Sequence, residues 1–315
     1  MAWNILFEDK SRLVFKESHT AKYNLRIKTD TVIGGVVLKS EAEITWLIQI
    51  NINPKGDFKL NLITLDHRLI SYSNPMLREI ADISQTFGRL YNDLELLMSE
   101  EGKIVKILNY DTIVKKWEYL KKDLDKLSME ANLTEIIKLN ESTLENEQKV
   151  IANIMQTEFF AVFFNLYYSE YIPNTTSEYK KYNLLNTHLV KWRYHLSLNE
   201  LKDKTKIVKQ EGKLAESLDK KWFNQAYENF MHIDLENKKA ILKDEAQYHL
   251  GDKNQVLLGK IIKSEIVDTN FLYAKYEYDL EMVEDSYQTL GNVLPNSTLE
   301  QQKQPPRSSN SLIID

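Results

Sequence analysis

Apolar and polar residues alternate with a period of two through much of the first seventy residues. In YNLRIKT (23–29), Tyr23, Leu25 and Ile27 fall on one side of an extended chain. The same alternation runs through EAEITWLIQINI (41–52) and DFKLNLITL (57–65). Successive side chains of a strand point to opposite faces, so the pattern predicts strands with one buried face. Gly34-Gly35 predicts a tight hairpin turn, and the region is expected to form an antiparallel meander.

The middle of the chain changes to helical spacing. Pro75 is suited to the first turn of a helix, and a second helical segment is expected over 85–98. The stretch 101–108 predicts a turn and a short strand, and an apolar stripe predicts a helix that ends near Leu127. Two more helical segments are expected in 131–155, the second beginning at a capping box formed by Ser142 and Glu145.

Extended structure is expected to return after residue 180. LVKWRYHLSL (189–198) and NFLYAKYEYDLEMV (270–283) both alternate strictly, and 214–230 has the spacing of one helix. The apolar run FFAVFFNLYY (159–168) has ten residues, which is too short to span a bilayer and predicts a buried element. The polar stretch after Gly291 is rich in Pro, Gln and Ser, and we expect it to be disordered.

These elements predict an α+β fold with antiparallel β-meander or partial-barrel regions at both ends, a helical middle segment and a disordered C-terminal tail. The expected division is an N-terminal β-rich region with packed helices (1–130), a helical connector (131–180), a C-terminal β-rich region with one helix (181–290) and the tail (291–315).

Composition narrows the classes of function. The 315 residues carry a net charge of −5 and no basic stripe, so nucleic acid is not an expected partner. The chain has no cysteine, which excludes disulfides, thiolate nucleophiles and Cys-based metal sites. The first residues lack the pattern of a secretory leader and no segment has the length of a membrane span, so a cytoplasmic location is expected.

No pattern of catalytic or cofactor-binding residues stands out. The six histidines show no His-Glu-x-x-His spacing, and the nine glycines form neither a nucleophile elbow nor a phosphate-binding loop. We therefore predict no catalytic residues, no metal site and no cofactor. The sequence favours a non-enzymatic protein. An enzyme whose acids and histidines meet only in the fold is kept as an alternative, after the two binding functions described next.

The aromatic residues suggest where binding occurs. Phe271 and Tyr273 lie on the more polar side of the 270–283 strand, and the tail ends in the apolar residues Leu312, Ile313 and Ile314. These five residues are the predicted contacts of a protein partner, to which a rigid β-rich surface is presented. The alternative is a carrier of an apolar small molecule or lipid inside a curled sheet, with a cavity lined by Trp46, Ile48, Phe58 and Leu60. The sequence sets no oligomeric state.

Overall fold

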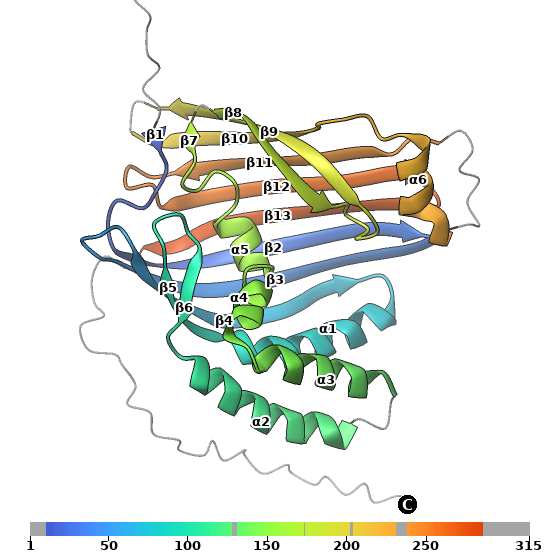
Figure 1. Ribbon diagram of the computed structural model, residues 1–315, viewed down its shortest axis with the longest axis horizontal. Helices are drawn as coiled ribbons and strands as arrows, with labels where there is room; N and C mark the ends of the chain where they lie inside the picture. The colour runs from blue at the N-terminus through green and yellow to red at the C-terminus, as the bar shows by residue number, and fades with distance from the viewer. Residues whose placement is uncertain (1–10, 128–130, 173, 202–203, 231–237, 286–315) are drawn as a thin grey trace, which may run out of the picture.

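Most strands of the protein belong to one large antiparallel sheet (Figure 1). The computed structural model describes residues 11–127, 131–172, 174–201, 204–230 and 238–285. Within them an eleven-stranded sheet has the order β6-β5-β4-β3-β2-β13-β12-β11-β10-β9-β8. Its strands are β2 (His19–Ile33), β3 (Val36–Ile52), β4 (Phe58–Tyr72), β5 (Asp93–Met98), β6 (Ile104–Ile107), β8 (Asn174–Tyr182), β9 (Leu189–Glu200), β10 (Lys206–Leu214), β11 (Ile241–Leu250), β12 (Val256–Asp268) and β13 (Leu272–Asp285).

The pairing of β2 with β13 joins the two strand-rich parts of the chain. It runs from Leu272 opposite Ile33 to Asp285 opposite Ala21, with one register shift after Met282. The expected combination of antiparallel meander and helices is confirmed, and the strands of both β-rich regions share one sheet. The β2–β3 turn is formed by Gly34 and Gly35 at φ of 60° and 81°, the left-handed region that primed turns require.

The helices lie on the apolar face of the sheet and beside β4 (Figure 1). They are α1 (Pro75–Gly88), α2 (Tyr110–Leu127), α3 (Ala131–Leu144), α4 (Glu147–Ile154), α5 (Glu158–Phe163) and α6 (Lys220–Tyr227), with single 3₁₀ turns at Arg89–Tyr91 and Glu228–Phe230. The apolar run predicted to be buried forms α5, whose Phe159 ring meets Trp46 of β3 edge-on at 5.2 Å between centroids. Phenylalanines from α5 therefore fill the concave side of the meander.

Two details of the helical prediction are wrong. The segment 85–98 was expected to be helical throughout, but α1 ends at Gly88. The last six residues of the segment form β5 instead, which places Leu94, Leu96 and Met98 in the core. The predicted capping box does not begin α4, because Asn146 is its N-cap and accepts a hydrogen bond from the backbone N–H of Gln148 at 2.8 Å. Asn is as good an N-cap as Ser.

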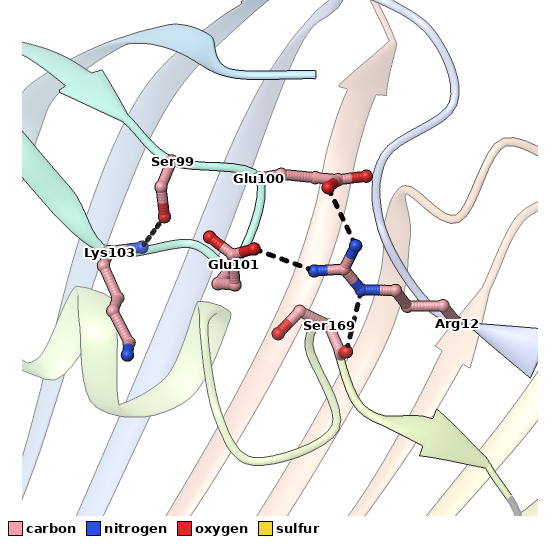
Figure 2. Close-up of polar contacts among 6 residues, drawn as sticks. All are labelled: Arg12, Ser99, Glu100, Glu101, Lys103 and Ser169. Carbon is pink, nitrogen blue, oxygen red and sulfur yellow. Dashed lines mark hydrogen bonds and ion pairs between the residues drawn. The ribbon is translucent and has the colours of Figure 1, made fainter. Parts of the chain in front are cut away.

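A short ribbon ties the start of the described chain to the rest of the molecule. β1 (Ser11–Arg12) pairs with β7 (Tyr171–Ile172). The guanidinium of Arg12 donates to Glu100 Oε2 at 2.8 Å, to Glu101 Oε1 at 3.1 Å and to the Ser169 carbonyl at 3.2 Å (Figure 2). One side chain thus connects the ribbon to the turn between β5 and β6.

No helix within the described ranges combines the length and apolarity needed to cross a bilayer. The predicted disordered tail (291–315) lies outside the described residues.

Candidate functional site

The outer face of the sheet carries the polar half of each alternating strand. Along β2 the odd-numbered residues Tyr23 and Leu25 are buried, whereas Arg26 on the other face has a side chain that is 53% exposed. The helices α4, α5 and α6 pack against the opposite, apolar side. The period of two therefore produces one dry face and one broad polar face, which we call the outer face.

The outer face is hollowed over seven neighbouring strands, from β4 to β10 in the order of the sheet. A central open hollow of about 500 Å³ is bordered by Asn24 and Arg26 of β2, Lys260 of β12 and Asp279 of β13. A second hollow of about 280 Å³ over β10, β11 and β12 shares Gln247 and Lys260 with it. A third, of about 320 Å³, lies farther along β2, β3 and β13 and also reaches β4. We call these three hollows of the outer face the trough.

Ion pairs between adjacent strands hold the side chains of the outer face. Arg26 lies 3.0 Å from Glu41 of β3 and connects the central hollow to the third hollow. Three further cross-strand pairs on this face are Arg68 with Glu43 at 2.8 Å, Lys39 with Asp30 at 3.0 Å and Lys260 with Asp279 at 3.9 Å, and Lys275 pairs with Glu277 within β13. The charge of the paired side chains alternates in sign from strand to strand. The trough therefore presents both positive and negative side chains.

Both aromatic residues predicted to contact a partner lie at one end of this trough. Tyr273 is half-buried and borders the third hollow, beside Lys28 and Lys275. Phe271 is 49% exposed in the β12–β13 turn, and its carbonyl accepts a hydrogen bond of 2.8 Å from the N–H of Gly34. The turns β2–β3 and β12–β13 therefore meet here. The other predicted contacts, Leu312, Ile313 and Ile314, lie outside the described residues.

The residues predicted to line an apolar cavity are packed in the core. Trp46, Ile48, Phe58 and Leu60 are each at most 3% exposed. The Phe58 ring stacks on Phe164 at 6.2 Å between centroids, just beyond α5. The four side chains border none of the five hollows found in the described part of the chain. An apolar ligand among them stays a prediction, and it would require α5 to move.

A second polar site lies on the inner face, beneath the β8–β9 hairpin, which crosses in front of the other strands (Figure 1). Glu265 of β12 is fully buried there. Its carboxylate accepts hydrogen bonds from Tyr227 Oη at 2.6 Å, Asn183 Nδ2 at 2.7 Å, and the backbone N–H groups of Leu184 and Leu185 at 2.6 and 3.2 Å. Burial and the neighbouring carboxylate raise the pKa of the Tyr227 phenol.

Asp244 forms a second buried cluster on the adjacent strand. Its Oδ2 accepts a hydrogen bond from Tyr194 Oη at 2.8 Å and lies 3.9 Å from Lys181 Nζ. Lys181 also donates to Tyr194 Oη at 3.1 Å and sits over its ring at 4.6 Å from the centroid. Burial lowers the pKa of Lys181, Asp244 acts against this, and nearby Lys263 lowers it further.

Sequence reasoning missed this inner cluster. Asp244 and Glu265 stand in alternating strands where acids normally face water, and only the long-range position of the β8–β9 hairpin buries them. A weak indication was available, since both acids share a strand face with apolar neighbours such as Ala246 and Val267. In the described residues, His, Asp and Glu side chains form no group of three or more with a geometry suited to a metal ion.

Comparison with known proteins adds little to this geometry. No protein-family model matches the sequence, and no curated protein matches it either. Among solved structures, the chain is similar to one described as lipid–protein interactions in lipovitellin, with a TM-score of 0.41 and 10% sequence identity. The similarity covers 89% of this chain and 26% of that chain, so this chain spans about a quarter of its length. A similarity of that size assigns neither a family nor a ligand.

Proposed function

We propose that this protein is a non-enzymatic binding or assembly protein whose outer sheet face, the hollowed trough, docks a protein partner. The observation that supports it most is the trough itself, which lies over seven strands and has Phe271 and Tyr273 at one end. The size, the rigidity and the charge of this face also favour the docking of a protein partner.

The outer face is large enough for a stable interface. Seven strands spaced about 4.8 Å apart give a width of about 29 Å from the first to the last, and a strand of 15 residues such as β2 is about 50 Å long. The resulting area exceeds the roughly 800 Å² per partner that a standard interface buries. A single protein domain could therefore dock within the trough and leave a solvated rim.

The face is also rigid before binding. Its strands are paired on both sides, as for β2 between β3 and β13, and cross-strand ion pairs restrict the long side chains. Less conformational entropy is then lost when a partner docks. Alternating signs of charge favour a partner with complementary rows of charge and fix its register.

The aromatic end supplies a candidate anchor. Binding energy concentrates in a few residues, with Trp, Tyr and Arg over-represented. Of these types the cluster supplies Tyr273, which lies beside Lys28 and Lys275, and Phe271 adds an exposed aromatic ring in the adjoining turn. We expect these two aromatic residues to contribute more affinity than any ion pair of the trough.

The test compares two charge-swapped variants that keep the net charge of −5. In the first, Lys260→Glu is combined with Glu281→Lys in the trough. In the control, Lys115→Glu is combined with Glu118→Lys on the exposed side of α2. A partner isolated with the wild-type protein is titrated against each by isothermal calorimetry.

We expect at least tenfold weaker binding for the trough swap and a change below twofold for the control. Equal affinities for both variants, with unchanged melting temperatures, would exclude the outer face as the docking surface. A tenfold loss that occurs only in the control would place the interface on α2.

A further inference from the structure

The pocket beneath the β8–β9 hairpin has the size and the charge of a ligand site. It encloses about 230 Å³ between the hairpin and the strands β11 and β12. At ~30 Å³ per water molecule this is the volume of about eight waters, which is room for a ligand of the size of benzoate. The wall includes Lys181, Trp192, Asp244, Lys263 and Glu265.

Lys263 is a half-buried lysine of β12 that borders the pocket. It stands directly opposite Asp244 in the β11–β12 register and on the same face. Within the described residues, no ion pair or hydrogen bond of Lys263 to Asp244 or to any other residue is found. A partly desolvated ammonium group normally has a counter-charge, because burial of an unpaired charge is costly.

The two carboxylates of the pocket are engaged to different degrees. Glu265 uses both oxygens to accept four hydrogen bonds from neutral donors. Asp244 accepts from Tyr194 and pairs with Lys181 through Oδ2, whereas its buried Oδ1 has no hydrogen-bond partner among the described residues. Two ammonium groups, those of Lys181 and Lys263, thus share the nearby charge of Asp244.

The lowered pKa of Lys181 agrees with this arrangement. Burial has the largest effect on it, and the charge of Lys263 adds to the lowering despite Asp244. An anion beside the Lys181 ammonium group would favour its charged form, so anion binding and the protonation of Lys181 would be coupled.

We propose that this pocket binds a small organic oxyanion, with its charged group between Lys181 and Lys263 and its body against Trp192. The indole of Trp192 is stacked near Tyr194 with ring centroids 6.0 Å apart, which gives a flat apolar wall beside the two cations. A planar carboxylate or phosphate ester fits this combination of wall and charge. The site is independent of the outer face, since the two lie on opposite sides of the sheet.

The experiment measures binding of benzoate, phenyl phosphate and the neutral analogue benzamide to the full chain by calorimetry. We expect both anions to bind and benzamide to bind at least tenfold more weakly. Preference for benzoate or for phenyl phosphate distinguishes a carboxylate ligand from a phosphate ligand. Lys263→Gln should weaken anion binding at least tenfold.

Lys243→Gln is the control, because Lys243 adjoins Asp244 in β11 but its ammonium group pairs with Glu245 at 2.7 Å on the opposite face of the sheet. Its affinity should change less than twofold. With ¹³C-labelled lysine, NMR titration should also show the pKa of Lys181 rise when benzoate is bound. Three results would each overturn the proposal. They are equal binding of benzamide and benzoate, equal affinities of the Lys263→Gln and wild-type proteins for benzoate, and no anion binding at about 50 mM. A dissociation constant of 50 mM, or about 2 kcal/mol, is roughly the weakest affinity that calorimetry resolves.

Discussion

The carboxylate of Glu265 accepts a hydrogen bond of 2.6 Å from the hydroxyl of Tyr227, although the two residues are 38 positions apart in the chain. Tyr227 is in the last turn of α6 and Glu265 is in β12, so the contact fixes the helix over the sheet. Both side chains are fully buried. The same carboxylate holds the β8–β9 turn through the backbone N–H groups of Leu184 and Leu185.

Glu265→Gln should destabilise the protein strongly. The substitution replaces one accepting oxygen by an NH₂ group that faces the donors of the β8–β9 turn, which leaves buried N–H groups unsatisfied. We expect a loss of about 2–4 kcal/mol in the free energy of unfolding, measured by urea titration. Glu281→Gln, on the exposed outer face, should change it by less than about 0.5 kcal/mol. Equal effects of the two substitutions would contradict the role given to Glu265.

Buried phenols should make the protein unstable in alkali. Burial raises the pKa of Tyr194, Tyr227 and Tyr248 in the folded state, with the first two also raised by nearby carboxylates. Their contribution to the free energy of unfolding is complete below pH 10. It is lost as the pH rises above 10, because only the unfolded chain then releases the phenol protons. Each phenol should lower stability by about 1.4 kcal/mol per pH unit above its unfolded pKa.

The variant Tyr227→Phe isolates one of these groups. Its stability should fall less steeply with pH between 10 and 11 than that of the wild-type protein, by about 1.4 kcal/mol per pH unit. Tyr119→Phe, at an exposed position of α2, should leave the slope unchanged. The slopes come from urea titrations at several pH values. A Tyr227→Phe slope equal to that of wild type would mean that the phenol ionises in the folded state.

Arg12→Ala should loosen the β1–β7 ribbon. The guanidinium loses two ion pairs and a hydrogen bond to the Ser169 carbonyl (Figure 2), and it is only 24% exposed. We expect a loss of about 1–2 kcal/mol, with faster amide exchange in β7. Arg193→Ala is the control, because its pair with Glu178 is more exposed and should contribute less than about 0.5 kcal/mol. Unchanged exchange in β7 would show that Arg12 does not hold the ribbon.

Gly102→Ala should be far more harmful than Gly34→Ala. Both glycines have positive φ, at 74° and 60°. A Cβ on Gly102 would lie 2.8 Å from the Tyr168 ring, whereas a Cβ on Gly34 meets nothing within 4 Å. We expect a loss of about 2–4 kcal/mol at Gly102 and about 1–2 kcal/mol at Gly34, measured by thermal unfolding. A smaller loss at Gly102 than at Gly34 would contradict the packing of the β5–β6 turn.

Local patterns predicted the elements whose burial is decided by their own neighbours. The alternation in 41–52 predicted β3, whose residues Ile44, Trp46, Ile48 and Ile50 are buried as expected. The pattern in 189–198 likewise predicted β9, and the apolar run 159–168 predicted a core element. In each case hydrophobic periodicity and burial agree because one face of the element meets the core.

Elements that depend on distant contacts were predicted poorly. In 93–98, DLELLM fits either a helix or a strand, and pairing with β4 selects the strand. The pairing of β2 with β13 brings together segments about 250 residues apart, which no local pattern encodes. For the same reason Tyr273 was recognised as a candidate from its own strand, but the inner cluster of Asp244 and Glu265 was not.

Site-specific photo-crosslinking tests the docking of a partner on the outer face most directly. A photoreactive phenylalanine analogue replaces Tyr273 or Lys260 in the trough, and Tyr119 on α2 in the control, and the proteins are irradiated in extract of the source cells. The account predicts that one protein, identified by mass spectrometry, is crosslinked from both trough positions and not from position 119. Crosslinks to that protein only from position 119, or equal crosslinking from all three positions, would contradict it.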